Sequence, residues 1–194
     1  MTAGRQINSL SQDWCTPPKY VKAVKDFFGG KILLDPCSNI HSIVKAEVEY
    51  MLPETNGLSA SWNFLTIYVN PPYGADRLRG TTIASWLQKC AESNKKYENE
   101  VLALIPVAPN TKHWKKYVFG AANSICFLAD TRLKFINGGN DKGAPMACAM
   151  VYWGKHPDKF YKIFSNFGAV VEITSLQKNG WVSPDVGKQL FENF

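Results

Sequence analysis

The chain has 194 residues, of which 45% are hydrophobic and 20% charged, an ordinary globular composition that excludes disorder of the whole chain. Its formal net charge of +6 favours a polyanionic partner, although charge alone indicates only an attraction for phosphates. The five cysteines form no Cys-x-x-Cys pair, which indicates reduced thiols, and the three histidines are widely spaced, so we expect no metal site.

The hydropathy of the chain indicates neither a signal peptide nor a membrane-spanning helix. Its first residues are polar and lack the apolar segment of a signal peptide. No apolar run approaches the ~20 residues of a membrane-spanning helix. We therefore expect one cytoplasmic domain over residues 1–194, with a polar tail over 1–12 and no membrane contact. The sequence leaves open whether the protein is a monomer or a dimer.

Strand-like and helical stretches alternate along the chain, which favours an α/β fold with a mostly parallel central sheet flanked by helices. Pro17 and Pro18 open a helix over 19–28, with Thr16 as the expected N-cap and the glycines at 29 and 30 as its end. Strands are expected over 31–35, 44–50, 66–69, 101–107, 124–128, 146–153 and 170–173. Further helices are expected over 82–99 and 111–122, and loops over 74–80 and 137–145.

The run Asn70-Pro71-Pro72-Tyr73 carries the strongest chemical signal, because it directly follows the strand predicted over 66–69. Ligands of open α/β sheets bind beyond the carboxyl ends of such strands. An amine on an aromatic ring is a poor nucleophile, because its lone pair is delocalised into the ring. Hydrogen-bond acceptors for the amine protons favour the rehybridised nitrogen, which attacks a methyl sulfonium. The Asn70 side-chain oxygen and the Pro71 carbonyl are candidate acceptors, and Tyr73 can lie flat against the ring. The run predicts an S-adenosylmethionine-dependent methyltransferase, although prolines can also merely end an edge strand.

A second signal lies in residues 32–39, where an apolar strand ends at Asp35 and a turn begins with Pro36-Cys37. An acid at this point of a nucleotide-binding half-domain can hold the ammonium group of a cofactor. The alternative is a plain Asp-Pro turn.

These motifs, taken in order, resemble the phage-type DNA N-6-adenine methyltransferases, the Dam-like family found in phages and prophages. The resemblance covers residues 12 to 153. Its marks are residues 13–18, 34–38, 56–58 with Trp62, 69–74, 104–106, Thr111 with Trp114, and 132–135. Together, the order and spacing of these motifs are specific to the family. Taken singly, only the Asn-Pro-Pro-Tyr run is specific.

The resemblance implies a Rossmann-like methyltransferase fold that binds S-adenosylmethionine across the strand ends, in a bacterial or phage-infected cell. The matching cofactor-binding residues are Trp14, Thr16 and Pro17 ahead of the first strand, Asp35, Pro36 and Cys37 after it, then Asn56 and Asn70. Family members often carry an acid at the position of Asn56, so this chain departs from the pattern there. A role in restriction-modification or anti-restriction is expected.

Basic residues near these motifs are candidates for binding double-stranded DNA. They are Arg77, Arg79, Lys112, His113, Arg132 and Lys134. A solvated helix face with one buried tryptophan is the alternative around Trp114, and a structural hairpin is the alternative around residues 132–135.

The leading hypothesis is site-specific methylation of adenine N6 in DNA, on an adenine turned out of the duplex. The same four residues would suit RNA adenine or a protein glutamine amide. A catalytically silent DNA-binding relative is the third alternative.

Overall fold

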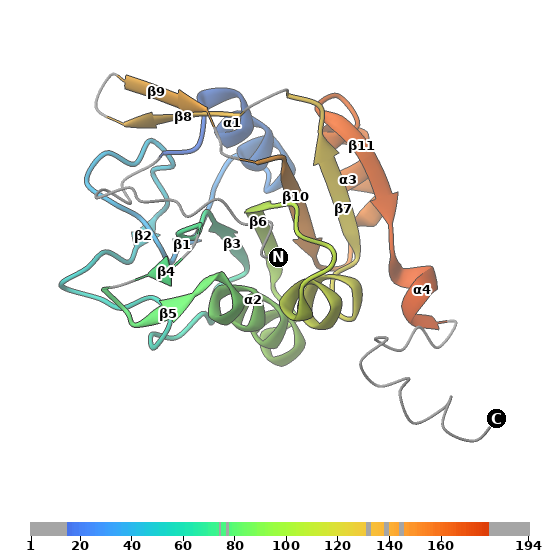
Figure 1. The fold of residues 1–194 in the computed structure, drawn as a ribbon, viewed down its shortest axis with the longest axis horizontal. Coiled ribbons are helices and arrows are strands. Elements are labelled where there is room, and N and C mark those ends of the chain that lie inside the picture. Colours follow the sequence, from blue (N-terminus) through green and yellow to red (C-terminus); the bar gives the residue numbers. More distant parts are fainter. Residues whose placement is uncertain are drawn as a thin grey trace.

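The computed structural model describes residues 15–73, 75–76, 78–130, 133–137, 140–143 and 146–178. Its main sheet contains β1 (Leu34–Asp35), β2 (Val48–Glu49), β3 (Thr66–Val69), β6 (Glu100–Pro106), β7 (Ser124–Leu128), β10 (Cys148–Trp153) and β11 (Gly168–Glu172). The strands lie in the order β11-β7-β10-β6-β3-β1-β2 (Figure 1).

The sheet is mixed, which corrects the expectation of a mostly parallel one. The pairings of β1 with β2, β1 with β3 and β3 with β6 are parallel. The pairings of β10 with β6, β10 with β7 and β11 with β7 are antiparallel. No crossover helix is described between β7 and β10. Without such a helix β10 returns beside β7 in the opposite direction, so the two strands pair antiparallel.

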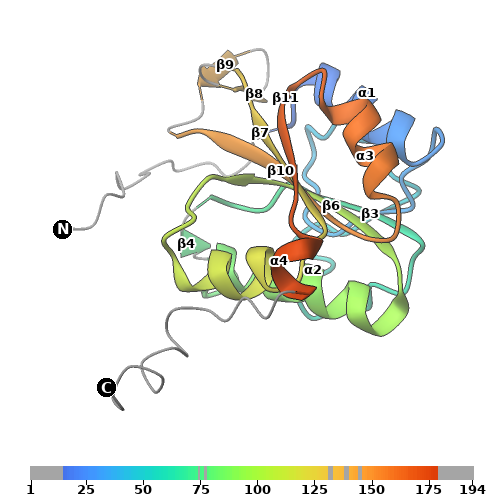
Figure 2. The ribbon, with the colours of Figure 1, turned by 90° about the vertical axis from the view of Figure 1, so that its right-hand side faces the viewer.

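Helices cover both faces of the sheet. They are α1 (Pro18–Phe27), α2 (Ile83–Tyr97), the π-helix η1 (Trp114–Phe119), α3 (Pro157–Phe164) and α4 (Thr174–Lys178). Figure 2 shows α1 and α3 on one face and α2 on the other. Alternate residues of a strand point to opposite faces, so Tyr68 packs into the core under α1 and α3, whereas Ile67 packs into the core over α2. Both faces are buried, which explains the unbroken apolar run of β6.

Most predicted elements are present. β3 and β7 have the expected bounds, and α1 ends as expected at two glycines with positive φ, 77° at Gly29 and 105° at Gly30. β1 and β2 are shorter than the predicted strands over 31–35 and 44–50. The predicted N-cap is wrong: Pro17 is the cap residue of α1, and the Thr16 hydroxyl is hydrogen-bonded elsewhere.

Two hairpins replace the loops expected over 74–80 and 137–145. The first pairs β4 (Ala75–Asp76) with β5 (Thr81–Thr82), and the second pairs β8 (Lys134–Asn137) with β9 (Asn140–Gly143). The helix predicted over 111–122 is the short π-helix η1, and α3 was not predicted. No helix in the described part of the chain is long and apolar enough to cross a membrane.

The strand order reverses between β1 and β3. After β1 the chain moves outward to β2, and after β3 it moves outward in the opposite direction to β6. Such a switch point leaves a crevice at the carboxyl ends of the two central strands, where open α/β sheets bind their ligands.

Candidate functional site

A narrow pocket of about 30 Å³ lies at this switch point. It is lined by Cys15, Thr16, Asp35, Cys37, Ser38, Asn39, Ser42, Val44, Asn70 and Pro72. Three segments that are far apart in the sequence therefore meet: the residues before α1, the turn after β1 and the loop after β3. Thr16, Asp35, Cys37, Asn70 and Pro72, all predicted from the sequence, share this one pocket.

Asp35 is the buried acid of the pocket, with only 4% of its surface exposed. The pKa of Asp35 is raised to about 7, mainly by burial and in part by the nearby Glu49 carboxylate, whereas the hydrogen bond that Asp35 accepts from the Cys37 N–H opposes the rise. Burial also raises the pKa of the Cys37 thiol, which the neighbouring Asp35 reinforces. A cation placed in the pocket would stabilise the ionised form of Asp35.

Glu49 is a functional candidate that the sequence reasoning missed. It ends β2 and pairs in register with Asp35 across the two parallel strands. Its Oε1 atom is buried and has no hydrogen-bond partner among the described residues. Buried carboxylate oxygens normally have partners, so Oε1 is suited to accept a hydrogen bond from a ligand. Its place as an acid at the end of the second predicted strand was the available signal.

A wider hollow of about 270 Å³ adjoins Glu49. It is lined by Ile40, Glu49, Met51, Leu52, Pro53, Glu54 and Thr55. Asn39 lines the first pocket and Ile40 the second, so consecutive residues line the two hollows. The wider hollow combines apolar walls with carboxylates, a lining suited to a nucleoside with ribose hydroxyls.

The loop with Asn56 packs directly on the turn after β1. A Cβ on Gly57 would lie 1.7 Å from the Pro36 carbonyl oxygen, so only glycine fits this approach. The Trp62 indole donates to the Gly57 carbonyl at 2.8 Å, and the Asn56 side-chain oxygen accepts from the Leu58 N–H at 3.0 Å. Asn56 therefore shapes the loop, and its contact with a cofactor stays a prediction.

The residues before α1 are fixed to the strand that carries the Asn70 loop. Thr16 is buried, and its hydroxyl lies 2.7 Å from the hydroxyl of Tyr68 in β3. Pro17 is also buried but does not line the pocket, and Trp14 lies outside the described residues. The Thr16–Tyr68 contact holds this segment at the pocket that Thr16 lines.

The loop after β3 divides its residues between the pocket and the core. Asn70 and Pro72 line the pocket, while Pro71 is buried. Tyr73 donates its hydroxyl to the Leu104 carbonyl at 3.0 Å, and its ring meets Phe135 edge-on at 5.4 Å. The Tyr73 ring is thereby fixed beside β6, and its stacking on a substrate base stays a prediction.

The described residues bear on only some of the predicted DNA contacts. Arg77 and Arg132 lie outside the described residues, as does the side chain of Lys134. The Arg79 side chain is only 7% exposed and is paired with Asp76 at 2.9 Å, so its burial does not support a phosphate contact.

Around η1, the tryptophan is buried, as the alternative interpretation expected. Trp114 is fully buried and donates to the Pro106 carbonyl at 3.1 Å, so it is a core residue rather than a base-stacking platform. Lys112 is exposed, whereas His113 is half-buried with its Nε2 atom 3.1 Å from the Thr111 hydroxyl. Burial lowers the pKa of His113. DNA contacts by Lys112 and His113 remain predictions.

Within the described ranges, no group of His, Cys, Asp or Glu side chains could hold a metal ion. The Asp35 carboxyl lines the narrow pocket and Glu49 lines the wider hollow, and carboxyl groups of this kind can hold an organic cation.

Comparison with known proteins decides the family. The model of the family described as DNA N-6-adenine-methyltransferase (Dam) matches residues 5–181. The chain belongs to this family. A DNA N-6-adenine-methyltransferase of Haemophilus phage HP1 (strain HP1c1) is 26% identical over 137 residues, which cover 71% of this chain and 73% of the relative. No solved structure matches the chain. The resemblance to the Dam family predicted from the sequence is confirmed.

Both chemical signals of this Dam family member therefore meet in one place. Its Asn-Pro-Pro-Tyr loop follows β3, its buried acid ends β1, and both line the crevice between these strands.

Proposed function

We propose that this Dam family protein methylates the exocyclic N6 amine of adenine in double-stranded DNA, with S-adenosylmethionine as methyl donor. One observation carries the proposal: Asn70 of the predicted catalytic loop and Asp35 of the predicted cofactor turn line the same pocket. Membership of the Dam family supports adenine in DNA as the substrate. The phage relative's name supports the same substrate.

The residues of the pocket fit this cofactor, which carries an ammonium, a sulfonium and an adenosine. Asp35 would hold the ammonium group, since an ionised carboxylate pairs with a cation. The unpartnered Oε1 of Glu49 would accept a hydrogen bond from a ribose hydroxyl, and the wider hollow would take the nucleoside. When bound, S-adenosylmethionine supplies an electrophilic methyl group.

The Asn70 loop would orient and activate the amine. The Asn70 side-chain oxygen and the Pro71 carbonyl accept hydrogen bonds from its two protons, which concentrates the nitrogen lone pair toward the methyl group. Proline carries no N–H that competes for these bonds. No strong general base is required, because the nitrogen becomes acidic once methylated and loses its proton to solvent. An adenine in a duplex reaches such a loop only after leaving the base stack.

The Rossmann-like character of the fold is part of the proposal. The reversal of strand order between β1 and β3, with the pocket at their carboxyl ends, supports it. The antiparallel half of the sheet lies on the far side of β6 from the pocket strands and leaves the switch point unchanged.

A competition between substrates tests the proposed function. Duplex DNA, RNA and a protein with accessible glutamines are offered together with tritiated S-adenosylmethionine. The proposal predicts label in duplex DNA. Label mainly in RNA or protein would contradict the substrate, and absence of cofactor binding in calorimetric titration would indicate a silent DNA-binding relative.

A further inference from the structure

Leu78 lies in the turn between β4 and β5, soon after the catalytic loop, and is 79% exposed. A single exposed leucine is normal on a protein surface and by itself needs no explanation. Leu78 differs because Asp76 and Arg79, on either side of it, are paired with each other and because it follows Tyr73 by only five positions.

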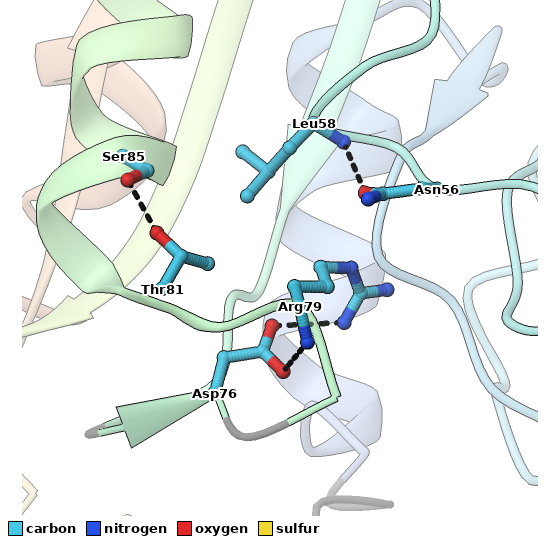
Figure 3. A network of polar contacts seen from close by, with 6 residues as sticks. All are labelled: Asn56, Leu58, Asp76, Arg79, Thr81 and Ser85. Carbon is cyan, nitrogen blue, oxygen red and sulfur yellow. Dashed lines mark hydrogen bonds and ion pairs between the residues drawn. The ribbon is translucent and has the colours of Figure 1, made fainter.

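The turn is closed by a buried ion pair, shown in Figure 3. The Asp76 carboxylate accepts one hydrogen bond from the Arg79 N–H at 3.2 Å and another from the Arg79 guanidinium at 2.9 Å. The Asp76 side chain is fully buried, and the guanidinium lies 5.2 Å from the ring of Trp86 in α2. A charged pair shielded from water in this way holds both ends of the turn in place.

The C-terminal side of the turn is anchored as well. Gly80 has φ of +61°, a conformation that favours glycine, and the hydroxyl of Thr81 is hydrogen-bonded to that of Ser85 in α2. In Figure 3 the Arg79 side chain lies beneath the loop of Asn56 and Leu58. The β4–β5 hairpin is therefore fixed to α2, and Arg79 lies close enough to the turn after β1 for its charge to act on the Cys37 thiol. Leu78 belongs to neither core cluster.

The hairpin stands at the proposed DNA-facing edge. Figure 1 shows the β4–β5 and β8–β9 hairpins on the left of that view, with β1 and β3 at a height between them. A duplex that presents an adenine to the Asn70 loop would lie across this edge.

We propose that Leu78 enters the base stack of DNA and occupies the space left by the target adenine when it turns out of the duplex. This inference rests on the proposed function. Unstacking a base costs a few kcal/mol, and apolar side chains inserted between base steps stabilise the opened duplex. A leucine presented by a fixed turn suits this position, since little of the turn's own conformational freedom is lost on insertion.

The test compares Leu78→Ala with Leu65→Ala in the full chain. Leu65 is a matched control, because it is 73% exposed and immediately precedes β3, at the end of that strand opposite to Asn70. The substrate is a duplex with the sequence that the wild-type protein modifies, carrying the target adenine either paired with thymine or opposite an abasic site. Methylation rate, S-adenosylmethionine affinity and the fluorescence of 2-aminopurine at the target position are measured.

Leu78→Ala should lower the methylation rate on the paired duplex about tenfold or more and reduce the 2-aminopurine signal, because opening the duplex has become harder. The loss should shrink several-fold opposite the abasic site, and Leu78→Met should recover most of the rate. Cofactor affinity should stay unchanged, and Leu65→Ala should match the wild type.

An unchanged rate for Leu78→Ala on the paired duplex would overturn the inference, as would an equal loss on both duplexes. Either result would leave the proposed function standing if the wild-type protein methylates DNA. A wild-type protein that methylates no adenine would overturn both.

Discussion

Asp35 and Glu49 lie opposite one another on neighbouring parallel strands, each at the end of its strand and each on the border of a hollow. Burial raises the pKa of Asp35, and the nearby Glu49 carboxylate adds to the rise. Below a pH of about 7 the free protein therefore holds a proton on Asp35 that a bound cation would displace. If Asp35 holds the cofactor as proposed, cofactor binding depends on pH.

The affinity for S-adenosylmethionine should rise as the pH rises through about 7, where Asp35 ionises. The ionised carboxylate binds the cofactor's ammonium, whereas the protonated form does not. Asp35→Asn should weaken binding about 10- to 100-fold, the loss expected for a hydrogen bond between charged groups, and should remove this pH dependence. Calorimetric titration across this range provides the measurement.

The buried Asp35 carboxyl should also lower the stability of the free protein at high pH. The folded-state pKa of Asp35 lies above its value in the unfolded chain, so the folded protein holds the extra proton between about 4 and 7. This contribution to stability is present below that window and is lost as the pH rises through 7. In thermal unfolding, the stability of the wild type should fall over this pH range and that of Asp35→Asn should not. If the stability of both proteins changed with pH in the same way, the prediction would be contradicted.

Glu49→Gln should weaken S-adenosylmethionine binding about tenfold, as expected for a lost hydrogen bond to a charged group. It should not destabilise the free protein, since Glu49 Oε1 has no partner among the described residues and the substitution removes a charge beside Asp35. Binding and urea unfolding are measured on the same sample. A large loss of stability with unchanged affinity would assign Glu49 to the fold rather than to the ligand.

Thr16 and Tyr68 should contribute jointly to stability. Thr16→Val and Tyr68→Phe each leave one buried hydroxyl without its partner at 2.7 Å, at a cost of about 1–3 kcal/mol. The double variant should lose less than the sum of the two, because no unpaired hydroxyl remains. Strictly additive losses in urea unfolding would show that the contact contributes nothing of its own.

The Asp76–Arg79 pair should behave like other buried ion pairs. Asp76→Asn leaves the Arg79 charge uncompensated and should lower the free energy of unfolding by about 3 kcal/mol. Combining it with Arg79→Met should restore much of this loss, since no buried charge is left. A double variant as unstable as Asp76→Asn would contradict that interpretation.

The sequence was most informative where one strong local pattern acts alone. Asn70 directly follows a β-branched run that ends at two prolines, so the strand could be predicted with its observed bounds, and the catalytic role of its end stays a prediction. Glu49 was overlooked because its strand has a mixed pattern and its role depends on pairing with β1, a contact between distant segments.

Thr16 and Arg79 show a second limit of sequence reasoning. A threonine before two prolines suggests a helix cap, and an arginine in a glycine-flanked segment suggests a phosphate ligand. In the folded protein the partner of Thr16 is Tyr68, 52 positions away, and no local pattern reveals such a tertiary contact. The partner of Arg79 is Asp76, only three positions away, but the burial of this pair depends on packing against α2 and cannot be read from the local sequence.

The most direct test of the central claim is nucleoside analysis of DNA from an expression host that lacks adenine methylation. We predict N6-methyldeoxyadenosine in DNA from cells expressing the wild-type protein and none from cells expressing Asn70→Ala, with both proteins folded to the same melting temperature. Unmodified adenine in the wild-type sample, from a protein that binds S-adenosylmethionine in vitro, would contradict the proposed function. Equal modification by Asn70→Ala would contradict the proposed catalytic loop.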